Sequence, residues 1–122
     1  MQVFDLLKTG SKKLRDNKII SHRLDSEIIL AKILNRSREE IIINMDEDLS
    51  FNDICKFDQL IKRRSKSEPI AYILNEKEFW SKNFYVNNSV LIPRPETELL
   101  VDKILNYYKN KNKNNKINIL DI

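Results

Sequence analysis

Glycine and cysteine are nearly absent: the 122 residues include one of each, Gly10 and Cys55. A loop that wraps around phosphate groups needs several glycines, because only glycine lets the backbone approach a ligand closely at positive φ. No complete nucleotide-binding loop can therefore lie within these residues. The lone cysteine excludes an internal disulfide. With a single histidine, His22, the chain also lacks the Cys/His cluster of a zinc site, and we expect no metal.

Long apolar runs are missing as well. No segment approaches the roughly 18 apolar residues of a membrane span, and acids such as Asp5 stand where a signal peptide would have its apolar core. We therefore expect a cytoplasmic protein that does not contact a membrane. The 22 lysines and arginines against 18 acids indicate a polyanionic partner only weakly, so direct nucleic-acid binding is not expected.

Apolar residues recur at helical spacing through the first half of the chain and predict a bundle of four helices. The first spans about Val3–Asp16, with Lys12 and Arg15 on the face opposite the leucines. The second opens at Ser21 or His22 and is apolar around most of its circumference. This pattern predicts a mostly α-helical N-terminal domain.

Two serines mark the starts of the third and fourth helices. Ser37 followed by Glu40 fits the capping box, in which a hydroxyl and a carboxylate bind free amide groups of the first turn. Ser50 with Asp53 repeats the signal. The fourth helix ends in the densest basic cluster of the chain, which is more typical of a solvated helix end than of a phosphate site: Lys62, Arg63, Arg64 and Lys66.

The organisation changes at Pro69, because proline disfavours helical backbone in the residue before it. Residues 70–92 are rich in β-branched and aromatic side chains and predict two short strands. Ser81–Asn83 is the expected turn, with Phe79 and Trp80 in the core of the hairpin. We expect this hairpin to link two domains.

A fifth helix is predicted from Pro93–Glu98, where prolines and then carboxylates suit a helix N-terminus. The Lys/Asn-rich tract 109–116 is typical of a solvated loop, and Ile117–Ile122 of a short, mostly apolar strand. A helix followed by such a strand begins a doubly wound α/β domain. The pattern therefore predicts a complete helical domain attached to the first pieces of an α/β domain.

Four stretches carry a further signal: Glu68–Leu74, Glu76–Ser81, Phe84–Val86 and Val90–Val101. Together they resemble the HemK/PrmC family of S-adenosylmethionine-dependent methyltransferases. These enzymes modify the glutamine side chain in the Gly-Gly-Gln motif of peptide chain release factors. Upstream, Arg23–Leu30 is similar to the family's N-terminal helical domain, although this segment is less specific.

The resemblance implies three parts. Residues 1–67 correspond to the N-terminal helical domain, 68–92 to a hairpin linker, and 93–122 to the start of an incomplete, Rossmann-like methyltransferase domain. Ile119–Ile122 matches the strand that leads into the family's glycine-rich cofactor loop. Asp121 stands where an acid opens that loop, which implies a contact with the cofactor.

For the start of the fifth helix, the resemblance implies side chains that line the cofactor and substrate pocket: Arg94, Glu96, Thr97 and Glu98. The same residues also fit an ordinary helix N-terminus, in which proline fixes the backbone and the carboxylates complement the helix dipole. No catalytic residue is assigned among them. One departure from the family is Asn75, where glycine is usual. Asparagine tolerates left-handed backbone, so the turn is expected to survive.

The resemblance implies methyl transfer by the intact enzyme, with release factors as partners and the helical domain helping to dock them. The motifs that hold S-adenosylmethionine and the substrate glutamine would follow Ile122. We therefore expect neither cofactor binding nor methyl transfer from residues 1–122 alone. Two alternatives stay open: an inactive truncated remnant, and a helical interaction module that binds a release factor or the ribosome.

Overall fold

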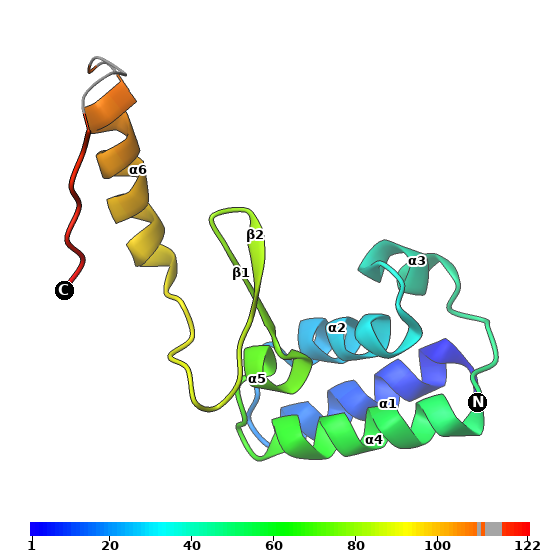
Figure 1. The fold of residues 1–122 in the computed structure, drawn as a ribbon. Helices are drawn as coiled ribbons and strands as arrows, with labels where there is room; N and C mark the ends of the chain where they lie inside the picture. The colour runs from blue at the N-terminus through cyan, green and yellow to red at the C-terminus, as the bar shows by residue number, and fades with distance from the viewer. Residues whose placement is uncertain (110, 112–115) are drawn as a thin grey trace.

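The computed structural model describes residues 1–109, 111 and 116–122, which form six helices and one two-stranded hairpin. In chain order the elements are α1 (Val3–Asp16), α2 (His22–Leu34), α3 (Arg38–Ile43), α4 (Phe51–Ser65), α5 (Ile70–Leu74), β1 (Glu76–Phe79), β2 (Lys82–Tyr85) and α6 (Pro95–Lys109). Helices α1, α2 and α4 pack against one another, and α3 packs against α2. The hairpin rises from α5, and α6 stands apart from the bundle (Figure 1).

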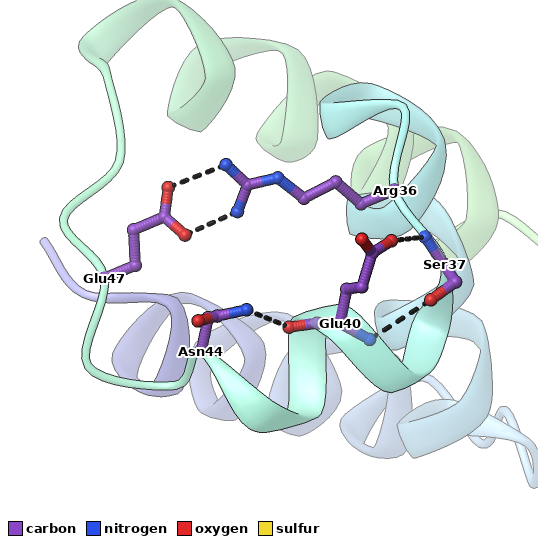
Figure 2. Close-up of polar contacts among 5 residues, drawn as sticks. All are labelled: Arg36, Ser37, Glu40, Asn44 and Glu47. Atoms are coloured by element: carbon purple, nitrogen blue, oxygen red, sulfur yellow. Dashed lines mark hydrogen bonds and ion pairs between the residues drawn. The ribbon is translucent and has the colours of Figure 1, made fainter.

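The four helices predicted in the first half of the chain are confirmed, and so are two of their caps. At α3, the Ser37 hydroxyl accepts a hydrogen bond from the N–H of Glu40 at 3.2 Å. The Glu40 carboxylate in turn accepts one from the N–H of Ser37 at 2.7 Å, which completes the capping box (Figure 2). At α4, the hydroxyl of Ser50 accepts a hydrogen bond from the N–H of Asp53.

Helix α3 has only six residues, too few to be stable in isolation, and polar contacts hold it. The guanidinium of Arg36 donates two hydrogen bonds to the carboxylate of Glu47, and the side chain of Asn44 donates to the carbonyl of Glu40 (Figure 2). The bond from Arg36 lowers the pKa of Glu47, and the backbone N–H and hydroxyl of Ser37 lower the pKa of Glu40. At pH values above the ordinary pKa of glutamate, both carboxylates therefore stabilise the folded state. This stabilisation is lost as the pH falls through the lowered pKa values.

The interior of the bundle is one apolar core between α1, α2 and α4. The two helices α1 and α4 meet at Gly10, where an added Cβ would lie 2.6 Å from Cζ of Phe57. Because Phe57 is fully buried, it has no room to move aside. The one glycine of the chain therefore serves close helix packing. The buried core residues are Val3, Leu6, Leu7, Leu14, Ile19, Ile29, Leu30, Ala31, Ile41, Phe57 and Ile61.

A buried ion pair crosses this bundle. Asp25 of α2 is only 4% exposed, and Nε of Arg64 in α4 lies 2.7 Å from its Oδ2. The hydroxyl of Ser21 donates to the same oxygen at 2.8 Å. Arg64 also donates from Nη1 to the carbonyl of Glu68 at 2.9 Å. The pair thus joins α2, α4 and the segment that leads into α5.

The prediction of β structure directly after Pro69 was wrong for Ile70–Leu74, which form helix α5. The β-branched and aromatic composition suggested a strand, but the helical conformation buries Ala71 and Ile73. Packing against the bundle therefore decides the conformation, as it often does for short segments. The helix ends at Asn75 with φ 56°, which confirms that asparagine takes the left-handed conformation here.

The hairpin itself is confirmed, but its turn lies earlier than predicted. Strands β1 and β2 pair antiparallel, with Phe79 opposite Lys82. The turn is formed by Trp80 and Ser81, at φ 52° and 54°, so Lys82 and Asn83 belong to β2. Asparagine and glycine are the usual residues at positive φ in such turns, which is why the composition pointed to the wrong positions.

Helix α6 confirms the predicted fifth helix of the sequence analysis. The strand predicted at Ile117–Ile122 is not formed: these residues are exposed and pair with no strand in the described part of the chain. A strand requires a neighbour that binds its N–H and C=O groups. The loop predicted at 109–116 falls mostly outside the described residues. None of the helices that the structure describes is long and apolar enough to cross a membrane.

We expect Asp25→Ala to lower the free energy of unfolding by about 3 kcal/mol or more, because it leaves the largely buried guanidinium of Arg64 without its anion. Urea unfolding followed by circular dichroism measures this loss. The matched control is Glu27→Ala, which removes the carboxylate of the more exposed pair with Arg38 and should cost at most about 1 kcal/mol. Equal losses in the two variants would contradict a special role for the buried pair.

Candidate functional site

The first turn of α6 gathers the residues predicted to line a pocket. Pro95 is the first helical residue, and Glu96 and Glu98 place carboxylates where the helix dipole favours negative charge. The N–H of Thr97 donates to the carbonyl of Arg94 at 3.1 Å. The structure therefore keeps the four predicted residues on one short segment that joins the linker to α6.

Glu98 makes a contact that the sequence did not reveal. Its Oε1 accepts a hydrogen bond from the backbone N–H of Trp80 at 2.9 Å. Trp80 opens the hairpin turn in a left-handed conformation that costs a non-glycine residue roughly 1 kcal/mol. A hydrogen bond from this N–H to a carboxylate offsets part of that cost. Glu98 thereby connects the start of α6 to the tip of the hairpin.

The other predicted site residues have free side chains. Arg94, Glu96 and Thr97 are exposed, and their side chains form no hydrogen bond or ion pair with another described residue. Asp121, the predicted cofactor contact, is also exposed and lies in the extended segment after α6. The structure therefore connects Glu98 to the hairpin, and among the described residues no hydrogen bond or ion pair joins Asp121 to the start of α6.

The described residues form no cluster that could hold a metal ion. Among them, no three side chains of the metal-binding types lie close enough to hold an ion. The one glycine, Gly10, is buried in the bundle, so no glycine-rich loop lies near Asp121. The described residues therefore contain no loop of the kind that wraps around a nucleotide with its backbone.

The basic cluster at the end of α4 is partly neutralised. Arg64 forms the buried pair described above, and Nε of Arg63 donates to the carboxylate of Glu68 at 2.9 Å. This bond raises the pKa of Arg63 and lowers that of Glu68. Lys62 and Lys66 are exposed. The arrangement supports a solvated helix end rather than a phosphate site.

An open groove of about 670 Å³ lies between α1 and the first half of α2, and sequence reasoning missed it. This α1–α2 groove has a mostly apolar lining to which Phe4, Leu7 and Met45 contribute. Across it, the Oγ of Ser11 lies 2.8 Å from Nδ1 of His22, a hydrogen bond that joins the two helices. Its rim carries four cations: Lys8, Lys12, Arg15 and Arg23.

The sequence held part of the signal for this groove. Lys8, Lys12 and Arg15 follow one another at intervals of four and three residues, which places them on one face of a helix. A polar helix face normally points into solvent, so the pattern alone gives no reason to expect a binding surface. Only the packing of α2 beside α1 turns this face into one wall of a groove.

We expect Glu98→Ala to speed hydrogen exchange at the Trp80 amide by about tenfold, because the variant removes the carboxylate that holds this N–H. Nuclear magnetic resonance measures the rate directly. The matched control is Glu96→Ala, which removes an equivalent charge from the same helix turn but no contact to the hairpin. The control should leave the rate of Trp80 unchanged. Equal acceleration in both variants would show that helix charge, and not the hydrogen bond, protects the turn.

Comparison with known proteins identifies relatives across most of the chain. Residues 5–74 match the family described as the PrmC N-terminal domain. The chain is 44% identical over 110 residues to the release factor glutamine methyltransferase of Buchnera aphidicola subsp. Baizongia pistaciae, covering 90% of this chain and 39% of that protein. It is 42% identical over 107 residues to the release factor glutamine methyltransferase of Leptospira interrogans, covering 88% and 37%. It is 46% identical over 97 residues to the bifunctional methyltransferase of Rickettsia felis, covering 80% and 18%.

These relatives are longer proteins, and the chain spans less than two fifths of the length of each. The similarity covers at least four fifths of the chain in each of the three cases, so it extends beyond the matched domain into the hairpin and the start of α6. Apart from Val3 and Phe4 at the start of α1, the helical bundle, with its confirmed caps and its buried ion pair, falls within the matched residues. The chain belongs to the PrmC family, and residues 5–74 are its N-terminal domain.

Proposed function

We propose that this chain supplies the substrate-docking part of a methyltransferase that modifies the glutamine side chain in the Gly-Gly-Gln motif of peptide chain release factors. The observation that carries the proposal is the 44% identity, over 90% of the chain, to a protein named release factor glutamine methyltransferase. Because release factors act in translation, the proposal places the protein in the cytoplasm. The partner is then a protein, and neither a membrane nor a nucleic acid is required.

The proposal divides the chain into three parts. Residues 1–67 dock the release factor, 68–92 form the linker, and 93–122 begin the methyltransferase domain. The fold supports this division in two places. Helix α5 packs on the bundle, so the linker leaves the docking domain from a fixed point. The hydrogen bond between Glu98 and the hairpin then fixes the start of α6 relative to the linker.

S-adenosylmethionine is the methyl donor in this proposal, and most of its binding site is assigned to parts of the whole protein other than the described residues. The exposed side chains of Arg94, Glu96 and Thr97 are available to line a substrate or cofactor pocket. Asp121 is proposed as a cofactor contact in the whole protein. No catalytic role is proposed for any of them, because none is paired with a group that would activate it for proton transfer.

Calorimetric titration of the purified chain tests the docking role. We expect saturable one-to-one binding of a release factor that carries the Gly-Gly-Gln motif. An unrelated protein of similar charge serves as the control and should give no binding. In the same instrument, S-adenosylmethionine should give no binding heat with the chain alone.

The outcomes separate the interpretations. Binding of the release factor without methyl transfer is expected of a docking domain, whereas an inactive remnant has no reason to bind. Failure of the release factor to bind would contradict the docking role. Stoichiometric binding of S-adenosylmethionine would contradict the assignment of cofactor binding to other parts of the protein.

A further inference from the structure

The α1–α2 groove combines an apolar lining with a cationic rim. Phe4 of α1 is half-exposed in the groove, and Leu7 and Met45 extend the apolar surface beside it. Lys8, Lys12 and Arg15 line the groove from α1, and Arg23 lines it from α2. A surface that is apolar inside and positive at its edges matches a ligand that is apolar on one side and negative at its borders.

These four cations have few contacts within the fold, although Nζ of Lys8 lies 5.9 Å from the ring centroid of Phe4. All four are exposed, and none forms an ion pair with a described residue. Other arginines of the bundle do have partners, namely Arg36, Arg38, Arg63 and Arg64. Even Glu27, the acidic residue that lines the groove, has its Oε2 2.8 Å from Nε of Arg38. The rim therefore carries four cations that have no ion-pair partner among the described residues.

The spacing of the cations indicates the shape of the ligand. Lys8, Lys12 and Arg15 lie on one face of α1 over about two helical turns, roughly 10 Å along the axis. Carboxylates at the same intervals on a second helix would meet all three. Helices that lay their apolar side in a groove between two other helices are a common mode of protein recognition.

We propose that the α1–α2 groove binds an acidic, amphipathic helical segment of the protein substrate. The apolar side of that segment packs against Phe4, Leu7 and Met45, and its carboxylates meet the cationic rim. This inference rests on the proposed function, which supplies a protein partner. The apolar lining favours a protein segment over RNA, since recognition of a nucleic-acid backbone depends on cations and stacking surfaces rather than on aliphatic side chains.

Fluorescence anisotropy with a designed peptide tests the groove without a release factor. The probe is a fluorescein-labelled helix of roughly 16 residues with leucines on one face and glutamates flanking them at intervals of four and three. Its matched control carries glutamine in place of each glutamate. We expect the acidic peptide to bind the full chain about tenfold more tightly than the control, and to lose affinity between roughly 50 and 150 mM salt.

Charge reversal locates the binding surface. The variant Lys12→Glu with Arg23→Glu reverses one charge on each wall of the groove and should weaken binding of the acidic peptide about tenfold. Lys62→Glu with Lys66→Glu is the matched control, because it changes the net charge equally at the end of α4. The control should change affinity less than about twofold. Thermal unfolding followed by circular dichroism confirms that each variant is folded.

Three results would overturn the inference: equal weakening in the two double variants, equal binding of the two peptides, or binding of a single-stranded RNA in preference to the acidic peptide. Titration of the release factor against the same variants separates this inference from the proposed function. If the groove variant binds the release factor as tightly as the wild-type chain does, the result contradicts the groove as the binding surface. The docking role of the domain is then left intact. Loss of release-factor binding in the groove variant alone supports both.

Discussion

The ion pair between Asp25 and Arg64 is the constraint on which the rest of the structure depends. A carboxylate buried this deeply is tolerated only with a cation and further hydrogen bonds around it, and Arg64 and Ser21 provide both. Because Arg64 also binds the carbonyl of Glu68, the same guanidinium fixes where the chain leaves α4. The register of α2 against α4 and the path into α5 are thus set by one side chain.

The two proposals rest on two regions beside this ion pair. The packing of α1 beside α2 creates the α1–α2 groove. Its four cations have no ion-pair partner among the described residues, whereas four other arginines of the chain are paired. On the far side of α5, the hairpin extends from the bundle, and Glu98 holds its turn against the start of α6. The groove of the proposed docking domain and the start of α6 are therefore joined through α5 and the hairpin, with the bond from Trp80 to Glu98 at the last step.

Local signals in the sequence predicted most of the helices, because caps such as Ser37 with Glu40 act within one turn. The predictions were wrong or incomplete where contacts with residues far away in the sequence determine the conformation. The composition of Ile70–Leu74 predicts β structure, but the segment is helical and packs Ile70 and Leu74 against the core of the bundle. At the candidate site, the segment from Arg94 to Glu98 could be named from its motif. The bond from Trp80 to Glu98 could not, since it joins residues 18 positions apart. The α1–α2 groove likewise exists only once two helices are packed.

Hydrogen exchange of the chain, measured by mass spectrometry with and without a release factor, tests the docking account most directly. The account predicts slower exchange in α1 and the first half of α2 on binding, with α4 unchanged, because residues of α1 and α2 line the groove and none of α4 does. Exchange that is unchanged throughout the bundle, or slowed only in α6 and the hairpin, would contradict it.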